Sequence, residues 1–304
     1  MKKIMSLLFL IPTLTFCVQK NIEKPNILVS IAPQKYWVQR IAGNKVNTDV
    51  LLKSNYNDYK HYPVEEELIK LQKCDVFLKI GVYTEKPILK RVPGVKTADT
   101  SEGIELRNVD LLHNLDRKLR MGIDEPISLR EAKRRNVYQV FGKDKLVWIN
   151  PKDAKIICNN IYKALVVIAP QDSMYFQDNL KLVNAELDEI HKLAEAELER
   201  GKGHFVLVLN TSIGYIADEF GFYQIPIHLE NKTEAILELN AIINYAQTNN
   251  IKLLIVPNED LKADGEKVAK SFDGIVEVFD PYSENYFENM NKLLKILYKI
   301  KEEK

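Results

Sequence analysis

Polar side chains suited to ligand binding stand directly after several short apolar runs that are typical of buried strands. Asn210 and Asp280 each follow such a run, and the loop 53–62, which is rich in Asn, Asp and Tyr and contains His61, follows another. Amide, carboxylate, phenol and imidazole groups can all hold a ligand. Because ligands of open parallel sheets bind at the carboxyl ends of the strands, these residues form the candidate binding site.

Motifs of the common catalytic sites are absent from the sequence. No Ser is flanked as in G-x-S-x-G, no glycine-rich phosphate loop follows a strand, and the acidic run Glu65 to Glu67 lies on a predicted helix surface. The histidines are scattered, and no two stand three or four residues apart, so no helical face carries a metal-binding pair. We therefore expect a binding protein and not an enzyme.

The longest predicted element is a helix from Pro170 to about Arg200, which has no internal Gly or Pro. Its apolar residues recur at steps of three and four, which places them on one helical face. These residues are Phe176, Leu180, Val183, Leu187, Ile190, Ala194 and Leu198. Gly201 and Gly203 end the helix, and about 30 residues give a rod of roughly 45 Å.

Short strands alternate with helices on both sides of this long helix, which is typical of parallel α/β sheets. We therefore predict an α/β fold of two lobes, each a parallel sheet flanked by helices, joined by one long rigid helix. A cleft is expected between the lobes. The predicted division is a signal segment 1–17, a tether 18–25, an N-terminal lobe 26–169, the linking helix 170–200 and a C-terminal lobe 201–304.

Composition limits the partners of the protein. The 304 residues include 43 basic and 42 acidic residues, a net charge of +1, which provides no global field to attract nucleic acid. After the N-terminus no apolar run of about 18 residues could span a bilayer. Cys74 and Cys158 are expected as buried free thiols, although a disulfide between them stays open. We expect a monomer that binds no nucleic acid.

The N-terminus has the features of a secretion signal. Lys2 and Lys3 precede a mostly apolar run, 4–16, that ends at Cys17. This placement predicts lipidation of Cys17, as in bacterial lipoproteins, although Phe16 stands where a small residue is usual. Simple cleavage and a retained anchor are the alternatives. In each case the folded part lies in the periplasm or on the cell surface.

Six stretches of the sequence together carry a resemblance to a known family. They are SIAPQKYWVQRIAGNKV, LIKLQKCDVFLKIG, TADTSEGIEL, VWINPKDAKIICNNI, IGYIADEFGFYQIPI and VFDPYSENYFENM, and they span nearly all of residues 26–300. In this order they resemble the zinc/manganese solute-binding lipoproteins of ABC transporters. The resemblance implies ligand capture in the interlobe cleft and delivery to an ABC permease and its ATPase. It also implies a metal ion held by three His and one acidic residue.

The metal site that the resemblance implies is mostly replaced in this chain. Tyr59 stands at the first His position, with His61 at a neighbouring Tyr position, Leu146 at the second and Asn210 at the third. Only the acidic residue is kept, as Asp280. A leucine cannot coordinate a metal, so Leu146 is expected only to line the cleft. Most of the affinity for zinc should be lost.

Three interpretations of the cleft remain. In the first, one divalent or trivalent metal ion (zinc, manganese or iron) binds a rearranged site made of Asp280, His61, Asn210 and Tyr59. Oxygen-rich coordination favours Mn²⁺ or Fe³⁺ over Zn²⁺. In the second, an anion, a metal chelate or a small organic solute is bound by Tyr56, Tyr59, Asn210, Trp148 and Asp280. In the third, binding is lost and the lobes form an extracellular adhesin or interaction module.

The role of Trp148 stays open at this level. Its side chain either packs between the N-terminal lobe and the linking helix or contacts the solute.

Overall fold

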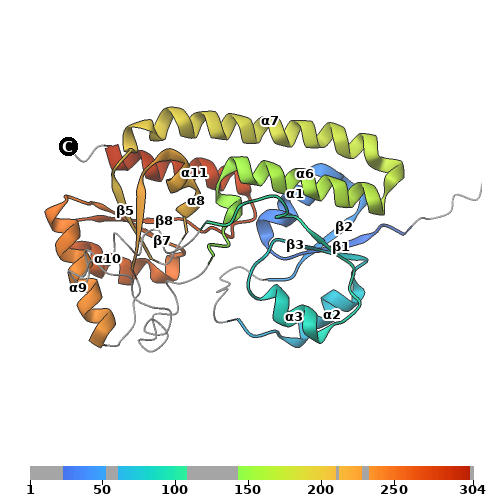
Figure 1. Cartoon of the computed structure of the whole chain (residues 1–304), viewed down its shortest axis with the longest axis horizontal. Coiled ribbons are helices and arrows are strands. Elements are labelled where there is room, and N and C mark those ends of the chain that lie inside the picture. The colour runs from blue at the N-terminus through green and yellow to red at the C-terminus, as the bar shows by residue number, and fades with distance from the viewer. Residues whose placement is uncertain (1–22, 53–60, 108–142, 210–211, 228–232, 302–304) are drawn as a thin grey trace, which may run out of the picture.

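The computed structural model describes residues 23–52, 61–107, 143–209, 212–227 and 233–301, which form two lobes side by side (Figure 1). Each lobe is built on a four-stranded parallel sheet. The predicted fold class is therefore confirmed.

Both sheets have the same strand order, β2-β1-β3-β4 in the N-terminal lobe and β6-β5-β7-β8 in the C-terminal lobe. In the first sheet, Leu28 pairs with Asp49 on one side and with Phe77 on the other. The strands are β1 (Asn26–Val29), β2 (Asn47–Val50), β3 (Val76–Lys79), β4 (Thr97–Asp99), β5 (Phe205–Leu209), β6 (Tyr223–Ile227), β7 (Leu253–Val256) and β8 (Ile275–Val278).

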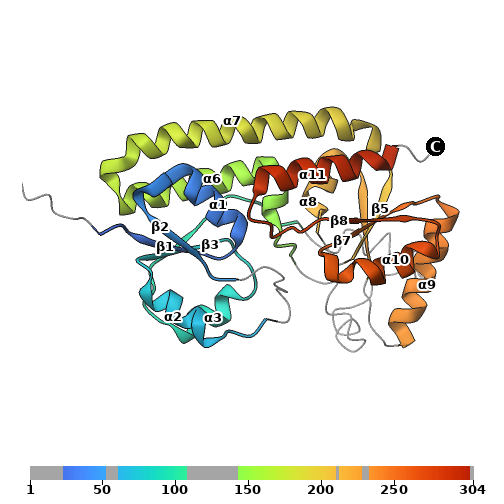
Figure 2. The same ribbon diagram turned by 180° about the vertical axis from the view of Figure 1, so that it is seen from behind.

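Helices cover both faces of each sheet. One face carries α1 and α6 in the N-terminal lobe and α8 and α11 in the C-terminal lobe, and the long helix α7 crosses this whole side (Figures 1 and 2). The opposite faces carry α2 and α3, and α9 and α10. The helices are α1 (Ala32–Ala42), α2 (Glu65–Lys73), α3 (Glu85–Arg91), α6 (Pro151–Ile168), α7 (Ser173–Leu198), α8 (Gly214–Phe220), α9 (Thr233–Thr248), α10 (Lys262–Lys270) and α11 (Tyr286–Tyr298).

The long helix α7 agrees closely with the pattern read from the sequence. Its 26 residues lie between two short 3₁₀ turns, Pro170–Asp172 and Glu199–Gly201. All seven apolar positions predicted to share a face are buried. They pack against α6, α1 and α11, so α7 is held along its length by helices of both lobes.

One continuous apolar core runs through both lobes on the side of α7. It includes Trp37 of α1, Phe176 of α7, Val208 of β5, Phe279 after β8 and Met290 of α11. A second, smaller core lies on the other face of the C-terminal sheet, under α9 and α10. Because the lobes share buried surface along α7, a large hinge movement would expose part of the main core to water.

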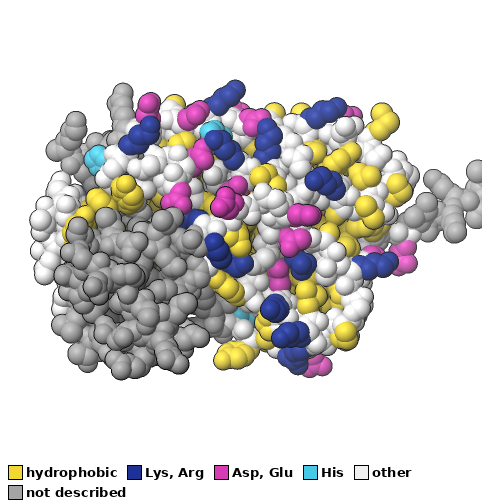
Figure 3. Space-filling model, in the orientation of Figure 1, with side chains coloured by type: hydrophobic (Ala, Val, Ile, Leu, Met, Phe, Trp, Pro, Cys, Tyr) yellow, Lys and Arg dark blue, Asp and Glu magenta, His cyan; other side chains and the backbone are white. Residues whose placement is uncertain are grey.

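Two further expectations can be compared with the structure. Both cysteines are free thiols, as expected, and Cys158 is buried, but Cys74 is only half-buried where burial was expected. Burial raises the pKa of the Cys74 thiol to about 11. No helix of the described residues has the length and apolarity needed to cross a bilayer. On the face shown in Figure 3, basic and acidic side chains are interspersed.

Candidate functional site

The carboxyl end of the N-terminal sheet is held by Gln34, a buried residue in the first turn of α1. Its Oε1 accepts the backbone N–H groups of Ser30 (3.0 Å) and Ile31 (3.2 Å). Its Nε2 donates to the carbonyl of Leu78 (3.2 Å) and to Oγ1 of Thr100 (2.8 Å). One side chain therefore joins the ends of β1, β3 and β4.

Glu85 completes this polar layer at the start of α3, with 5% of its surface exposed. Its carboxylate accepts hydrogen bonds from Oγ of Ser30 (2.5 Å) and from the N–H groups of Ile80 (2.8 Å) and Gly81 (2.9 Å). Burial raises the pKa of this carboxyl, and the three hydrogen bonds oppose the rise. The turn after β3 is thus fixed from inside the lobe.

Tyr83 connects that turn to the segment that carries Leu146. Its hydroxyl donates to the carbonyl of Lys143 (2.8 Å), and the ammonium of Lys145 lies 5.3 Å from the centre of its ring. Leu146 itself is partly buried against the main core. The wall of the N-terminal lobe beside Leu146 is therefore aromatic, apolar and cationic.

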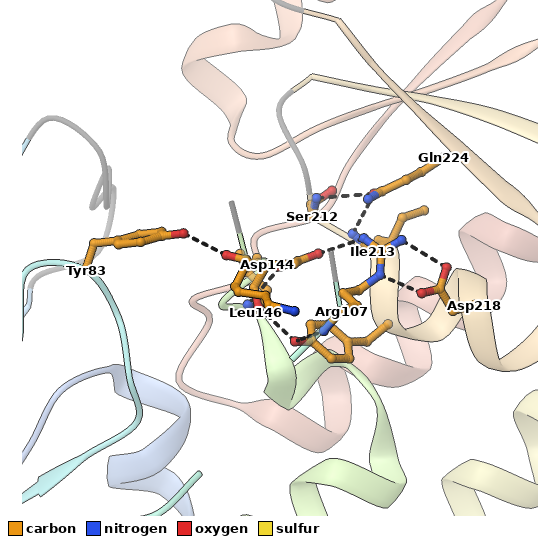
Figure 4. A network of polar contacts seen from close by, with 10 residues as sticks. Tyr83, Arg107, Asp144, Leu146, Ser212, Ile213, Asp218 and Gln224 are labelled. Carbon is orange, nitrogen blue, oxygen red and sulfur yellow. Dashed lines mark hydrogen bonds and ion pairs between the residues drawn. The ribbon is translucent and has the colours of Figure 1, made fainter. Parts of the chain in front are cut away.

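An ionic network joins the two lobes next to Leu146 (Figure 4), in which Arg107 and Asp144 are buried and the side chain of Asp218 is 47% exposed. Arg107 donates from Nε and Nη2 to both carboxylate oxygens of Asp218 on α8, at 2.7 and 2.9 Å. Its Nη1 donates to Asp144 at 3.0 Å. The hydroxyl of Tyr215, also on α8, donates to the carbonyl of Asp144 (2.8 Å) and accepts the N–H of Arg107 (3.3 Å). These four residues are called the Arg107 network below.

The electrostatics of the Arg107 network follow from its burial. The side chains of Arg107 and Asp144 are only 6% and 1% exposed. Burial raises the pKa of Asp144, against the opposing effects of the Leu146 N–H and of Arg107. Burial and the charge of Asp144 raise the pKa of Tyr215. Burial lowers the pKa of Arg107, but its two carboxylate partners outweigh this, so the guanidinium stays charged.

Trp148 brings the two lobes together a few residues further along. The indole is fully buried, its Nε1 donates to the carbonyl of Pro281 (2.7 Å), and its ring lies 5.4 Å from that of Tyr282. The hydroxyl of Tyr286 donates to the carbonyl of Trp148 (2.9 Å). The segment after Leu146 therefore lies against the segment after Asp280. The indole is thus packed against the C-terminal lobe, whereas the sequence led us to expect either packing against the linking helix or contact with the solute.

This chain is similar to known proteins over nearly its whole length. A family model described as "Zinc-uptake complex component A periplasmic" matches residues 27–300. The chain belongs to this family. A putative metal-binding protein of Chlamydia muridarum is 22% identical over 267 residues, which covers 87% of each chain. The high-affinity zinc uptake system protein ZnuA of Bacillus subtilis is 22% identical over 239 residues, 76% of this chain and 70% of that protein.

Solved structures of this family share the fold. The crystal structure of ZnuA superposes with a TM-score of 0.73 at 22% identity, covering 91% of this chain and 99% of that one. At this level of identity the likeness establishes the fold and leaves the ligand of this chain open.

Asp280 occupies the acidic position that the resemblance to this family implied. It is half-buried, its Oδ1 accepts the N–H of Tyr282 (2.9 Å), and its carbonyl accepts Nδ2 of Asn289 (2.8 Å). Burial raises the pKa of its carboxyl, and the Tyr282 N–H and the charge of Lys292 oppose the rise. One carboxylate oxygen is thus engaged in its own turn.

His61 is bound within the N-terminal lobe. Its Nε2 lies 2.7 Å from Oε1 of Glu67, a residue of α2 whose side chain is 7% exposed. The second oxygen of Glu67 accepts the N–H of Val64 (3.0 Å). No hydrogen bond between described residues joins His61 to Asp280. The other predicted positions, Tyr56, Tyr59, Asn210 and Cys17, lie outside the described residues.

A complete metal site is not formed by the part of the chain that the structure describes. There, no group of three or more His, Cys, Asp or Glu side chains could hold a metal ion. The four-residue site of Asp280, His61, Asn210 and Tyr59 therefore stays a prediction.

Sequence reasoning did not find the Arg107 network or the pair Gln34 and Glu85. Arg107 and Asp218 are 111 positions apart, and no local pattern links them. Gly214, the first residue of α8, was the available hint of a close contact, because a glycine leaves room for a neighbouring side chain.

Proposed function

We propose that this protein is the extracytoplasmic solute-binding component of an ABC transporter of the metal-uptake type. It captures its ligand between the lobes and delivers it to a permease and its ATPase. The match of the family model across both lobes, residues 27–300, carries this proposal. Lipidation of Cys17 would hold the chain at the membrane, in the periplasm or on the cell surface. Lobes at 26–169 and 201–304 with a linking helix at 170–200 are part of the same proposal.

For the ligand we propose a metal ion bound more weakly than in a three-His site. Asp280, His61, Asn210 and Tyr59 would hold it, and their oxygen-rich chemistry favours Mn²⁺ or Fe³⁺ over Zn²⁺. The contact between His61 and the buried carboxylate of Glu67 supports this proposal. Metal-binding imidazoles are commonly oriented by a carboxylate on the other ring nitrogen. Since Glu67 contacts Nε2 of His61, Nδ1 would be the nitrogen that binds the metal.

The test is thermal unfolding of the chelator-treated chain 18–304 with Zn²⁺, Mn²⁺ or Fe³⁺. We expect stabilisation by Mn²⁺ or Fe³⁺, because a ligand at 100 times its dissociation constant adds about 2.7 kcal/mol. His61→Ala should abolish the shift. His204→Ala, which removes an exposed imidazole at the start of β5, should preserve it. A flat panel for all three ions would exclude metal binding and leave the other two interpretations, a different solute or an interaction module that has lost binding.

A further inference from the structure

The Arg107 network holds together two segments that come from different lobes. Arg107 and Asp144 belong to the N-terminal lobe, whereas Tyr215 and Asp218 lie on α8 of the C-terminal lobe (Figure 4). A guanidinium that meets a carboxylate with two parallel N–H groups fixes both distance and orientation. Separation of the pair would cost the two hydrogen bonds to Asp218, whose side chain is 47% exposed, and would leave the buried guanidinium with Asp144 as its carboxylate partner.

The surface of α8 is shaped to receive this guanidinium. A Cβ atom on Gly214 would lie 2.1 Å from Nη1 and 2.6 Å from Cζ of Arg107, and 2.7 Å from Oδ2 of Asp144. Gly214 is the first residue of α8, and its backbone does not have the positive φ that only glycine adopts readily. The glycine is therefore required by the close approach of Arg107 and not by the course of the backbone.

The network also fixes segments on both sides of the predicted interlobe cleft. In the N-terminal lobe, Asp144 accepts the N–H of Leu146 (3.0 Å) and donates its own N–H to the carbonyl of Arg107 (3.1 Å). In the C-terminal lobe, α8 follows directly after Ser212 and Ile213. These two segments, the one with Leu146 and the one with Ser212 and Ile213, are called the two walls of the cleft. Movement of α8 relative to Asp144 would therefore change the distance between them.

We propose that Arg107 is a positioning residue of the interlobe cleft. The bidentate contact with Asp218 sets the separation of the two walls, and the lobes part only when this contact breaks. The shared core along α7 joins the two lobes on one side of the molecule. The Arg107 network joins them a second time, beside Leu146. This inference rests on the proposed function only in taking the cleft as the ligand site.

The experiment measures the distance between the lobes directly. Nitroxide labels at Glu65→Cys on α2 and Glu266→Cys on α10, both exposed positions, report it by pulsed electron paramagnetic resonance in chain 18–304 carrying Cys74→Ser. We expect one narrow distance distribution in this parent protein. Asp218→Asn and Arg107→Gln should each broaden it or add a second, longer distance.

A matched control separates this effect from the general loss of an ion pair. Lys155→Gln removes the contact of Lys155 with Asp188 (2.6 Å), which joins α6 to α7 and does not cross the cleft. This variant should keep the narrow distribution. An unchanged distribution in folded Asp218→Asn, or equal broadening in the control, would overturn the proposal.

Gly214→Ala provides a second route that leaves every charge in place. The added methyl group should displace the guanidinium and broaden the distribution as Arg107→Gln does. In an Arg107→Ser background the clash with the guanidinium is absent and only the contact with Oδ2 of Asp144 remains, so the same alanine should broaden the distribution less than it does in the parent. A Gly214→Ala protein with the parent distribution refutes the proposal even if the Arg107 variants do not fold. If none of the three ions stabilises the protein but the variants broaden the distance distribution, only the proposed metal ligand is refuted and the role of Arg107 stands.

Discussion

Gln34 on α1 of the N-terminal lobe and Gln224 on β6 of the C-terminal lobe make similar contacts from different elements, with different results. Each uses Oε1 to accept two backbone N–H groups after the first strand of its sheet, Ser30 and Ile31 after β1, and Ser212 and Ile213 after β5. The Nε2 of Gln34 has two acceptors. The Nε2 of Gln224 is buried and has no hydrogen-bond partner among the described residues.

The two walls of the cleft are therefore stabilised in different ways. A buried donor without an acceptor costs about 1–3 kcal/mol, and such groups are uncommon in folded proteins. All the hydrogen bonds of Gln34 are therefore made inside its own lobe. In the C-terminal wall, Nε2 of Gln224 has no such acceptor among the described residues. We infer that this wall depends more on contacts with the other lobe, through the Arg107 network and Trp148.

Replacing each glutamine by leucine tests this comparison and should give the largest effect. Gln34→Leu removes four hydrogen bonds in a fully buried place, so we expect a loss of about 3 kcal/mol in the free energy of unfolding. Gln224→Leu removes two long or moderate bonds but also removes the unpaired donor, so the loss should be about 1 kcal/mol or less. Urea unfolding of both variants measures the difference. Equal losses would contradict the comparison.

How much the sequence could predict depends on the range of the interaction. The buried face of α7 follows from steps of three and four residues, which are a local property of one helix. The strand ends at Asp280 and near Asn210 follow from local apolar runs. In contrast, Arg107 pairs with Asp218 across 111 positions, and Gln34 reaches Thr100 across 66. Nothing in a single sequence marks such partners.

Trp148→Phe tests the dependence of the C-terminal wall on the other lobe. The variant leaves a cavity in the core and removes the donor to the carbonyl of Pro281, so we expect a loss of about 2 kcal/mol. Tyr286→Phe is the matched control, since it removes one hydroxyl from the same contact and should cost about 1 kcal/mol. Urea unfolding compares the two. A loss for Trp148→Phe no larger than for Tyr286→Phe would show that the indole does not hold the wall.

Asp153→Asn should give the smallest effect, and its sign depends on pH. Asp153 lies in the first turn of α6, and burial, with the charge of Glu219 from the C-terminal lobe, raises its pKa to about 6. The folded protein therefore binds this proton more tightly than the unfolded chain, whose Asp has a pKa of about 3.9. The contribution of protonated Asp153 to the free energy of unfolding is present at low pH. It is lost as the pH rises from about 4 to 6.

The asparagine variant lacks this loss, so its stability relative to the parent should increase across that range. We expect a gain of about 1 kcal/mol above pH 6, a value reduced for solvent screening because the side chain is only half-buried. Asp178→Asn, an exposed substitution on α7, is the control and should show no such increase. The measurement is urea unfolding between pH 4 and 8. A difference between Asp153→Asn and the parent that stays constant over this range would mean that burial and the charge of Glu219 do not raise the pKa of Asp153.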